Sequence, residues 1–275
     1  MKRIMSVFLA LAIAAPGLTG CASKYGEQKT AVNYYPACYA PIQDLRDREH
    51  DVAKGTAVGG IVGALGGALV GLLATGKAEG AVMGAAVGGA GGLVAGNIYA
   101  SKQHQADDNV RLASYLQDLD GDISNLDVAG AAAQTSLKCY NQQFQALLAA
   151  IKSRAITPQA AQARFAEIMS GREEASNILG EVVTNARQLS QQYEQAFVQE
   201  ERQLDAPRKA PQSVAAKQAK KRTINRGREK AKELVKRERQ WTEVRNTAKQ
   251  DTAQQTQTFN TAYNEIVGNV TNATI

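Results

Sequence analysis

The chain has 275 residues, and its 32 Lys and Arg against 26 Asp and Glu give a formal net charge of +6. This small excess of positive charge does not indicate a nucleic-acid partner. Aromatic residues make up only 5% of the chain, and no stretch shows the alternation of apolar and polar residues that is typical of β-strands. The composition therefore favours an all-α fold.

Residues 1–20 have the pattern of a lipoprotein signal peptide. Lys2 and Arg3 precede an apolar run over residues 4–15 that is too short to count as a transmembrane helix. The run leads to Leu18-Thr19-Gly20-Cys21, which resembles the bacterial lipobox. That resemblance implies that Cys21 is acylated, with chains such as palmitate, and becomes the first residue of the mature protein. Ala22 does not resemble an inner-membrane retention signal, so we expect a lipid anchor in the outer membrane.

After a linker and a short helix over residues 21–54, residues 55–100 contain two glycine ladders with a spacing of four. This spacing places each ladder on one stripe of a helix. Glycine costs a helix about 1 kcal/mol relative to alanine, and close helix–helix packing in an apolar setting compensates for that cost. The residues between the glycines are mainly Ala, Val, Leu and Ile, so we interpret this segment as a zipper-like membrane hairpin rather than a flexible linker. The sequence leaves open whether this hairpin crosses the membrane completely. The ladder positions are Gly55, Gly59, Gly63, Gly67, Gly71, Gly80, Gly84, Gly88, Gly92 and Gly96.

Residues 101–275 are predicted to form a periplasmic helical coiled-coil domain. In a first helix over 101–153, apolar residues from Leu112 to Ile151 recur at steps of three and four, and only Gly130 interrupts them. A single helix is expected there, because this register continues through Asp120-Gly121-Asp122.

Two further long helices follow. The second covers 158–204, with Thr157 as its N-cap and Pro158 at its first position. The third covers about 212–270 and has a weaker apolar seam. Short connections between helices of ~70–80 Å imply antiparallel neighbours, so the predicted fold is an all-α, three-helix antiparallel coiled-coil rod that follows a lipid-anchored zipper hairpin.

Charged residues group at one end of this rod. Six aspartates of the first helix lie at the same expected height as a basic stretch that begins the third helix. The basic residues either pair with these carboxylates, at ~0–1 kcal/mol for each exposed pair, or contact anionic lipid head groups, at ~1 kcal/mol for each charge. The aspartates are Asp107, Asp108, Asp118, Asp120, Asp122 and Asp127. The candidates for lipid contact are Lys217, Lys220, Lys221, Arg222, Arg226 and Arg228.

Cys38 and Cys139 form an even pair in an exported chain and are candidates for a disulfide. The geometry is demanding, because Cys139 lies ~58 Å along a straight helix from Ala100. The 17 residues from Cys38 to Gly55 reach ~56 Å only when fully extended. We expect a bridge within one chain, with three alternatives for the conflict: a bend of the first helix near Gly121, a zipper that is not a simple spanning hairpin, or a bridge between two chains.

Signals for chemistry are weak. His50 and His104 stand alone, and no set of Cys, His and carboxylates has metal-ligand spacing. The sequence from Gly71 to Ala78 nearly matches a phosphate-binding loop, but it lacks the hydroxyl residue and no strand precedes it. We therefore expect no enzyme activity, no cofactor and no metal.

The C-terminal helix is expected to overhang its neighbours beyond about residue 245. Four apolar residues at helical spacing would then have no partner in the chain and could bind a second copy or another envelope protein. They are Phe259, Tyr263, Ile266 and Val270.

Cys21 together with the doubled glycine ladder resembles the glycine-zipper outer-membrane lipoproteins, of the SlyB and rickettsial surface-antigen type, over about residues 1–100. The resemblance implies an envelope protein that oligomerises through its zipper, contacts outer-membrane lipids and has a structural role in the cell envelope. The long helical rod departs from that family. The alternative function is a ring-forming component of a secretion or transport assembly that spans outer membrane and periplasm. A continuous pore would distinguish the alternative from the structural role.

Overall fold

The computed structural model describes residue 25 and residues 28–58, 98–103, 105, 107–206 and 213–272. In this part of the chain every regular element is a helix, so the all-α prediction is confirmed for it. The helices are α1 (Pro36–Val58), α4 (Ile98–Lys102), α5 (Asp108–Lys152), α6 (Pro158–Asp205) and α7 (Val214–Asn272).

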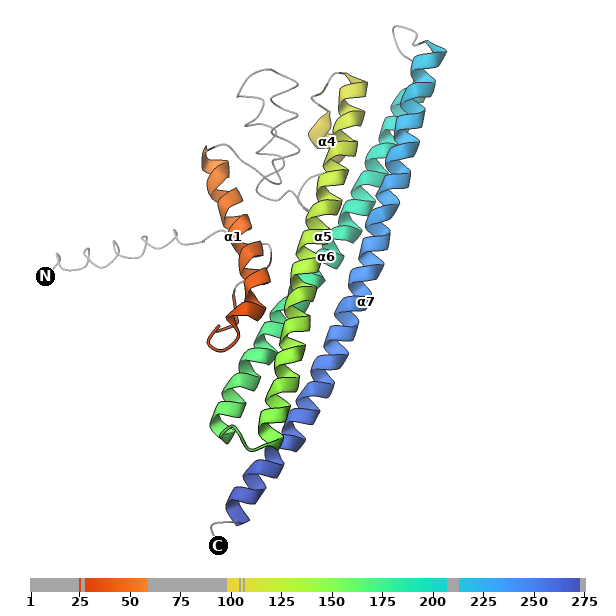
Figure 1. Ribbon diagram of the computed structural model, residues 1–275. Helices are drawn as coiled ribbons and strands as arrows, with labels where there is room; N and C mark the ends of the chain where they lie inside the picture. The colour runs from red at the N-terminus through yellow and green to blue at the C-terminus, as the bar shows by residue number, and fades with distance from the viewer. Residues whose placement is uncertain are drawn as a thin grey trace, which may run out of the picture.

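Three long helices, α5, α6 and α7, pack side by side along most of their length as a rod (Figure 1). The chain reverses between α5 and α6 and again between α6 and α7, so α6 runs antiparallel to both neighbours. The second helix begins as predicted: Thr157 is the N-cap, its hydroxyl accepts a hydrogen bond from the Ala160 N–H, and Pro158 follows. At about 1.5 Å per residue, α6 is ~70 Å long.

The first long helix, α5, starts at Asp108, later than the predicted start near residue 101. Its N-cap is Asp107, whose carboxylate accepts hydrogen bonds from the N–H groups of Asn109 and Val110. The N-cap residue has extended rather than helical backbone angles, so Asp107 separates α5 from any helix that precedes it. Residues 98–102 therefore form the separate short helix α4, and the predicted start at residue 101 is wrong. The predicted continuity through Gly121 is correct, because α5 is helical from Asp108 to Lys152.

The apolar seams of the three helices form the core of the rod. Leu119 of α5, Ile178 of α6 and Leu234 of α7 are fully buried, and one cluster of buried residues joins the three helices. A second cluster fills the end of the rod near the α5–α6 turn, around Phe144 and Ile168. Full burial of such side chains stabilises the fold by about 1.5–3 kcal/mol each.

The expected C-terminal overhang beyond residue 245 is wrong. Phe259 is only 4% exposed, and its ring stacks on Phe165 of α6 with centroids 3.8 Å apart. Tyr263 stacks on Phe259, and Ile266 packs against the same cluster. Because α6 runs antiparallel to α7, the start of α6 still covers α7 at this height. Only the last turns of α7 extend past the neighbouring helices (Figure 1); the side chain of Val270 lies outside the described residues.

Candidate functional site

The segment with the glycine ladders is the part of the sequence that indicates function most directly. Cys21 and the ladder positions from Gly59 to Gly96 lie outside the described residues, and Gly55 lies in the last turns of α1. The structure does describe the chain on both sides of this segment. We therefore treat the two flanking attachments to the rod as the candidate functional site.

The N-terminal attachment begins with an irregular segment, residues 28–35, here called the strap. Glu167 of α6 accepts three backbone hydrogen bonds from the strap, from the N–H groups of Asn33 (3.0 Å), Tyr34 (2.8 Å) and Tyr35 (2.8 Å). Both carboxylate oxygens are used, and Glu167 is buried. A buried carboxylate that accepts several N–H groups satisfies backbone that has no helix or sheet partner.

One heptad further along α6, Glu174 holds the rest of the strap. It accepts hydrogen bonds from the Thr30 N–H (3.1 Å) and the Thr30 hydroxyl (2.7 Å), and also from the Tyr39 hydroxyl and the Arg46 guanidinium of α1. Burial by itself raises the pKa of Glu174, but these hydrogen bonds and the Arg46 charge outweigh it and hold that pKa below its usual value. Glu174 therefore remains ionised at neutral pH and links strap, α1 and α6.

A disulfide between Cys38 of α1 and Cys139 of α5 closes the N-terminal attachment. The bridge lies within one chain, which is the interpretation that the sequence analysis favoured. The two distances that conflicted in the sequence were calculated for a straight helix that starts near residue 101. Because α5 starts at Asp108 instead, the bridge requires none of the three alternatives.

The distances agree once the position of α4 is known. Lys102 of α4 forms an ion pair with Asp118 of α5 (2.6 Å), so the chain rejoins the rod beside Asp118. From Asp118 to Cys139 is ~32 Å along α5, and from Cys38 to Val58 is ~30 Å along α1. Since α1 and α5 run in opposite directions (Figure 1), both flanks of the ladder segment lie at nearly the same height on the rod.

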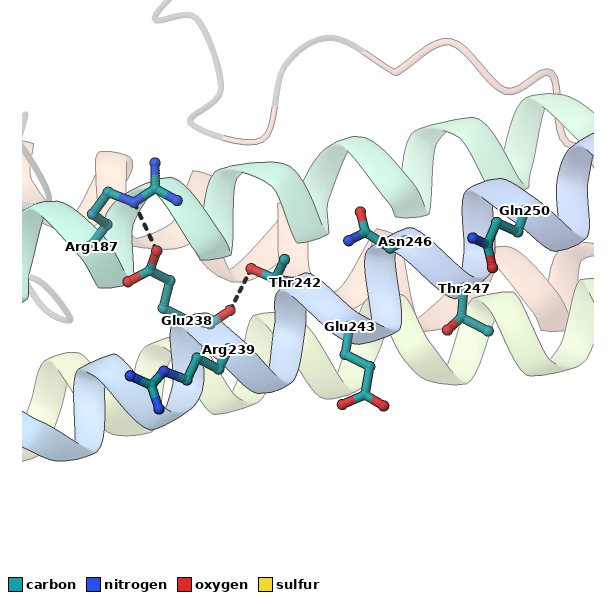
Figure 2. A pocket seen from close by; sticks show the side chains of 8 residues that line it. All are labelled: Arg187, Glu238, Arg239, Thr242, Glu243, Asn246, Thr247 and Gln250. Atoms are coloured by element: carbon teal, nitrogen blue, oxygen red, sulfur yellow. Dashed lines mark hydrogen bonds and ion pairs between the residues drawn. The ribbon is translucent and has the colours of Figure 1, made fainter.

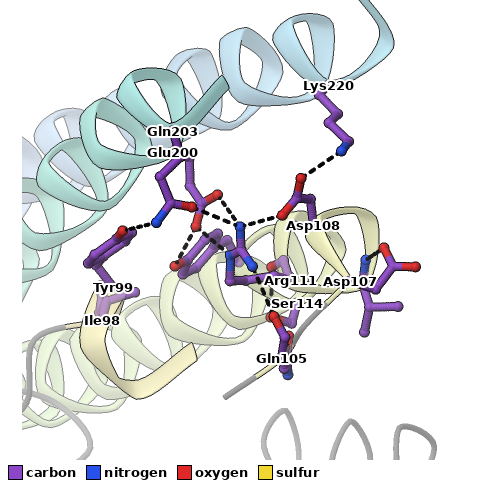
Figure 3. Close-up of polar contacts among 12 residues, drawn as sticks. Ile98, Tyr99, Gln105, Asp107, Asp108, Arg111, Ser114, Glu200, Gln203 and Lys220 are labelled. Carbon is purple, nitrogen blue, oxygen red and sulfur yellow. Dashed lines mark hydrogen bonds and ion pairs between the residues drawn. The ribbon is translucent and has the colours of Figure 1, made fainter. Parts of the chain in front are cut away.

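The C-terminal attachment is a polar network at the start of α5 (Figure 3). Arg111 donates two parallel hydrogen bonds to Glu200 of α6, from Nε (2.6 Å) and Nη2 (2.8 Å), and a third to the Gln105 carbonyl. Arg111 and Glu200 are both buried. Gln203 of α6 donates to the Tyr99 hydroxyl of α4. Bidentate arginine–carboxylate pairs fix orientation as well as distance, so this network holds α4, Gln105 and the start of α5 against α6.

Most of the basic stretch of α7 is paired with carboxylates of the same chain. Lys220 pairs with Asp108 (2.6 Å) and is itself buried. Lys217 pairs with Asp205, Lys221 lies 4.0 Å from Glu201, and Arg228 pairs with Glu201 and Glu194. Arg222 and Arg226 are exposed, and no ion pair joins either of them to another described residue. Internal pairing is therefore the interpretation that the contacts favour for four of the six candidate lipid-binding residues.

The same pairing extends along α5. Lys230 pairs with Asp120, and Arg237 donates to Asp127 (2.6 Å). Asp122 instead accepts a hydrogen bond from the Tyr193 hydroxyl of α6 (2.7 Å). The predicted common height is therefore correct for Asp108, which pairs with Lys220 of the basic stretch, whereas Asp120 and Asp127 lie lower and pair with residues beyond that stretch.

Within the described residues, no three His, Cys, Asp or Glu side chains are grouped as a metal site would require. An open groove lies between α6 and α7 (Figure 2), and none of the residues that line it belongs to the strap, α1 or α4. Arg187 and Glu238 pair across it (2.8 Å), and the Thr242 hydroxyl bonds to the Glu238 carbonyl. The groove is lined by Arg187, Glu238, Arg239, Thr242, Glu243, Asn246, Thr247 and Gln250.

Comparison with known proteins identifies one segment of the chain. Residues 1–100 match the family model of the YMGG-like Gly-zipper, which confirms the predicted zipper resemblance for that segment. Glycine zippers of this kind are typical of envelope and outer-membrane proteins. No curated protein and no solved structure matches the chain. None of the described helices is both long enough and apolar enough to span a membrane.

Proposed function

We propose that this protein is an outer-membrane lipoprotein with a structural role in the bacterial cell envelope. In this proposal, acylated Cys21 anchors the chain, the glycine ladders associate with those of other copies, and the rod lies in the periplasm. The proposal assigns no catalytic step and no cofactor to the chain.

One observation in particular supports the proposal: the helices on both flanks of the ladder segment are attached to the rod, and their ladder ends lie at nearly the same height along it. The disulfide and the two buried glutamates hold the entering flank, and the Arg111–Glu200 network holds the returning flank. A hairpin whose two ends are held together loses less conformational entropy when it packs against another hairpin. Such an arrangement suits a zipper that assembles copies of the chain.

The experiment is to replace ladder glycines in the full-length lipoprotein and to measure its mass in detergent by light scattering. Leucine at Gly63 and Gly67, or at Gly84 and Gly88, adds bulk where the helices would touch. We expect smaller assemblies and an unchanged circular dichroism spectrum of the rod. The matched control is Gly121→Leu, because a Cβ at Gly121 meets nothing within 4 Å. Unchanged assemblies in both ladder variants would contradict the proposal.

Lipidation has its own test. Mass spectrometry of the purified protein should find a mature N-terminus at Cys21 that carries acyl chains. A mature N-terminus elsewhere, without lipid, would contradict the anchor. Particle images of the same preparation would separate the two functions considered above, because rings with a continuous pore are expected only of the secretion or transport component.

A further inference from the structure

The ladder segment joins the rod at its side rather than at its end. Its returning flank lies beside Asp118, where Lys102 is paired, and α5 continues for ten more residues to Asp108, which is ~15 Å of helix. The rod beyond this point is charged: Lys220 pairs with Asp108, and the exposed pair Lys217–Asp205 lies further on. If the ladder helices entered the bilayer in the direction of the rod axis, the charged end of the rod would enter the hydrocarbon region beside them. Charged groups are costly there.

The lipid anchor is tied to the same side of the rod by a short tether. Tyr25 is buried in the main core cluster, and it lies only four positions after Cys21. Four Cα–Cα steps span at most ~14 Å. Acyl chains on Cys21 therefore enter the bilayer close to the rod surface beside the strap.

Both attachments lie over α5 and α6, and α7 covers the opposite side. The strap is bonded to α6 and α1 is bridged to α5, while α4 is held by Gln203 of α6 and Asp118 of α5. We infer that the rod lies side-on against the lipid leaflet, with the face formed by the strap, α1 and α4 toward the lipid and α7 toward the periplasm. This inference rests on the proposed function, because it requires an acylated Cys21 and a zipper in the membrane.

The exposed side chains of the strap suit a lipid interface. Tyr34 is 46% exposed, and the Arg164 guanidinium lies over its ring at 5.6 Å from the centroid. Lys29 is exposed at the other end of the strap. Tyrosine is enriched at the membrane–water interface, and basic side chains there meet lipid phosphates.

A pair of single-cysteine labels tests this orientation. Lys29→Cys places a label on the strap. Gln250→Cys places one at the same height in the open groove between α6 and α7, since Arg172, two residues from Glu174, donates to Thr252. Both positions are exposed. The full-length lipoprotein, labelled with a nitroxide, is reconstituted into vesicles of phosphatidylethanolamine and phosphatidylglycerol. Collision rates are measured with oxygen, which concentrates in lipid, and with a nickel complex, which stays in water.

We expect the ratio of oxygen to nickel collisions to be several-fold higher at Lys29→Cys than at Gln250→Cys. Equal ratios at the two positions, in protein that floats with the vesicles, would overturn the side-on orientation. The wild-type lipoprotein serves as the control: with Cys21 acylated and Cys38 bonded to Cys139, it should take up no label. Wild-type lipoprotein that fails to float with the vesicles would instead contradict the lipid anchor of the proposed function.

Discussion

The indole ring of Trp241 on α7 lies directly against the backbone of Gly130 on α5. A Cβ at Gly130 would come closer than 3.0 Å to three atoms of that ring. The one interruption of the α5 seam is therefore a position where a glycine makes room for the only tryptophan of the chain. Gly171 with Tyr140 and Gly227 with Phe197 repeat this arrangement at other heights of the rod.

Gly130→Ala should destabilise the rod even though alanine is the better helix former. The added methyl group collides with a buried ring, and overpacking of this kind costs about 1–3 kcal/mol. Gly121→Ala is the matched control on the same helix: nothing lies within 4 Å of its Cβ, so it should gain up to about 1 kcal/mol. Urea unfolding followed by circular dichroism measures both. A stabilised Gly130→Ala variant would contradict the packing described here.

Loss of the Cys38–Cys139 disulfide should lower the free energy of unfolding markedly. The bridge closes a loop of 101 residues, for which the chain-entropy account gives about 4–5 kcal/mol. Wild-type protein should unfold at lower urea concentration when a reductant is added. The double variant Cys38→Ser with Cys139→Ser should already be weakened and should not respond to the reductant. An unshifted midpoint in fully reduced wild type would count against a stabilising bridge.

Glu174→Gln should release the strap. The variant removes the charged partner from the buried Arg46–Glu174 ion pair, and breaking a buried ion pair costs about 3–5 kcal/mol. Glu173→Gln is the control, because Glu173 is the exposed neighbour. Limited proteolysis should cleave the strap, residues 28–35, faster in Glu174→Gln alone. Equal cleavage of the two variants would show that Glu174 does not hold the strap.

Asp122 and Glu174 should respond to pH in opposite directions. Burial raises the pKa of Asp122 to about 7, and the nearby Asp118 carboxylate raises it further. The hydrogen bond from Tyr193 and the charge of Lys102 lower this pKa and offset part of the rise. The folded state thus binds the proton more tightly than the unfolded chain. Its contribution to stability is complete below pH ~4 and is lost as the pH rises toward 7. For Glu174, whose pKa is lowered, stability is instead lost as the pH falls.

The variant Asp122→Asn should remove the first of these effects. Because one pKa unit corresponds to about 1.4 kcal/mol, the wild type should lose at most about 4 kcal/mol between pH 4 and 7 through Asp122. Asp122 is only half-buried, so a smaller loss is expected. Asp120→Asn, on the outside of the same turn, is the control. Urea midpoints measured at several pH values should give a flatter profile for Asp122→Asn only. If Asp122→Asn and wild type had the same profile, groups other than Asp122 would cause the pH dependence of stability.

Periodicity was sufficient to predict the three long helices, because apolar residues at steps of three and four define a buried stripe whatever the partner is. The cap at Thr157 was equally readable. Asp107 provides the same kind of signal, an aspartate before the apolar register begins, and it marks the true start of α5. Helix-forming residues continue on both sides of Asp107, so the pattern of residues alone does not separate α4 from α5.

The charged residues of the site could not be identified in this way. Glu167 and Glu174 are one heptad apart and lie beside the seam, and a carboxylate at such a position is usually solvated. Their burial depends on the strap, whose backbone N–H groups they satisfy. No local pattern predicts that a segment more than 130 residues earlier in the chain covers this face of α6. The recurrence of glutamate at a heptad spacing is the one signal that could have indicated it.

The end of α7 provides the last test, because the structure reverses the expectation for it. Phe259 fills the space between Phe165 and Tyr263, and Ala262 beside it is also buried. Phe259→Ala should therefore lower the free energy of unfolding by about 3–5 kcal/mol, as expected for a buried phenylalanine.

Truncation after Gln250 removes residues 251–275 and with them Phe259 and Tyr263, so it should lower the melting temperature of the rod. Truncation after Val267 should leave the melting temperature nearly unchanged. Equal melting of wild type and the Gln250 truncation would restore the overhang that the sequence suggested, with an apolar stripe free to bind a partner. Loss of stability in that truncation alone would place the boundary between core and free end within residues 251–267, which is where the antiparallel pairing of α6 and α7 puts it.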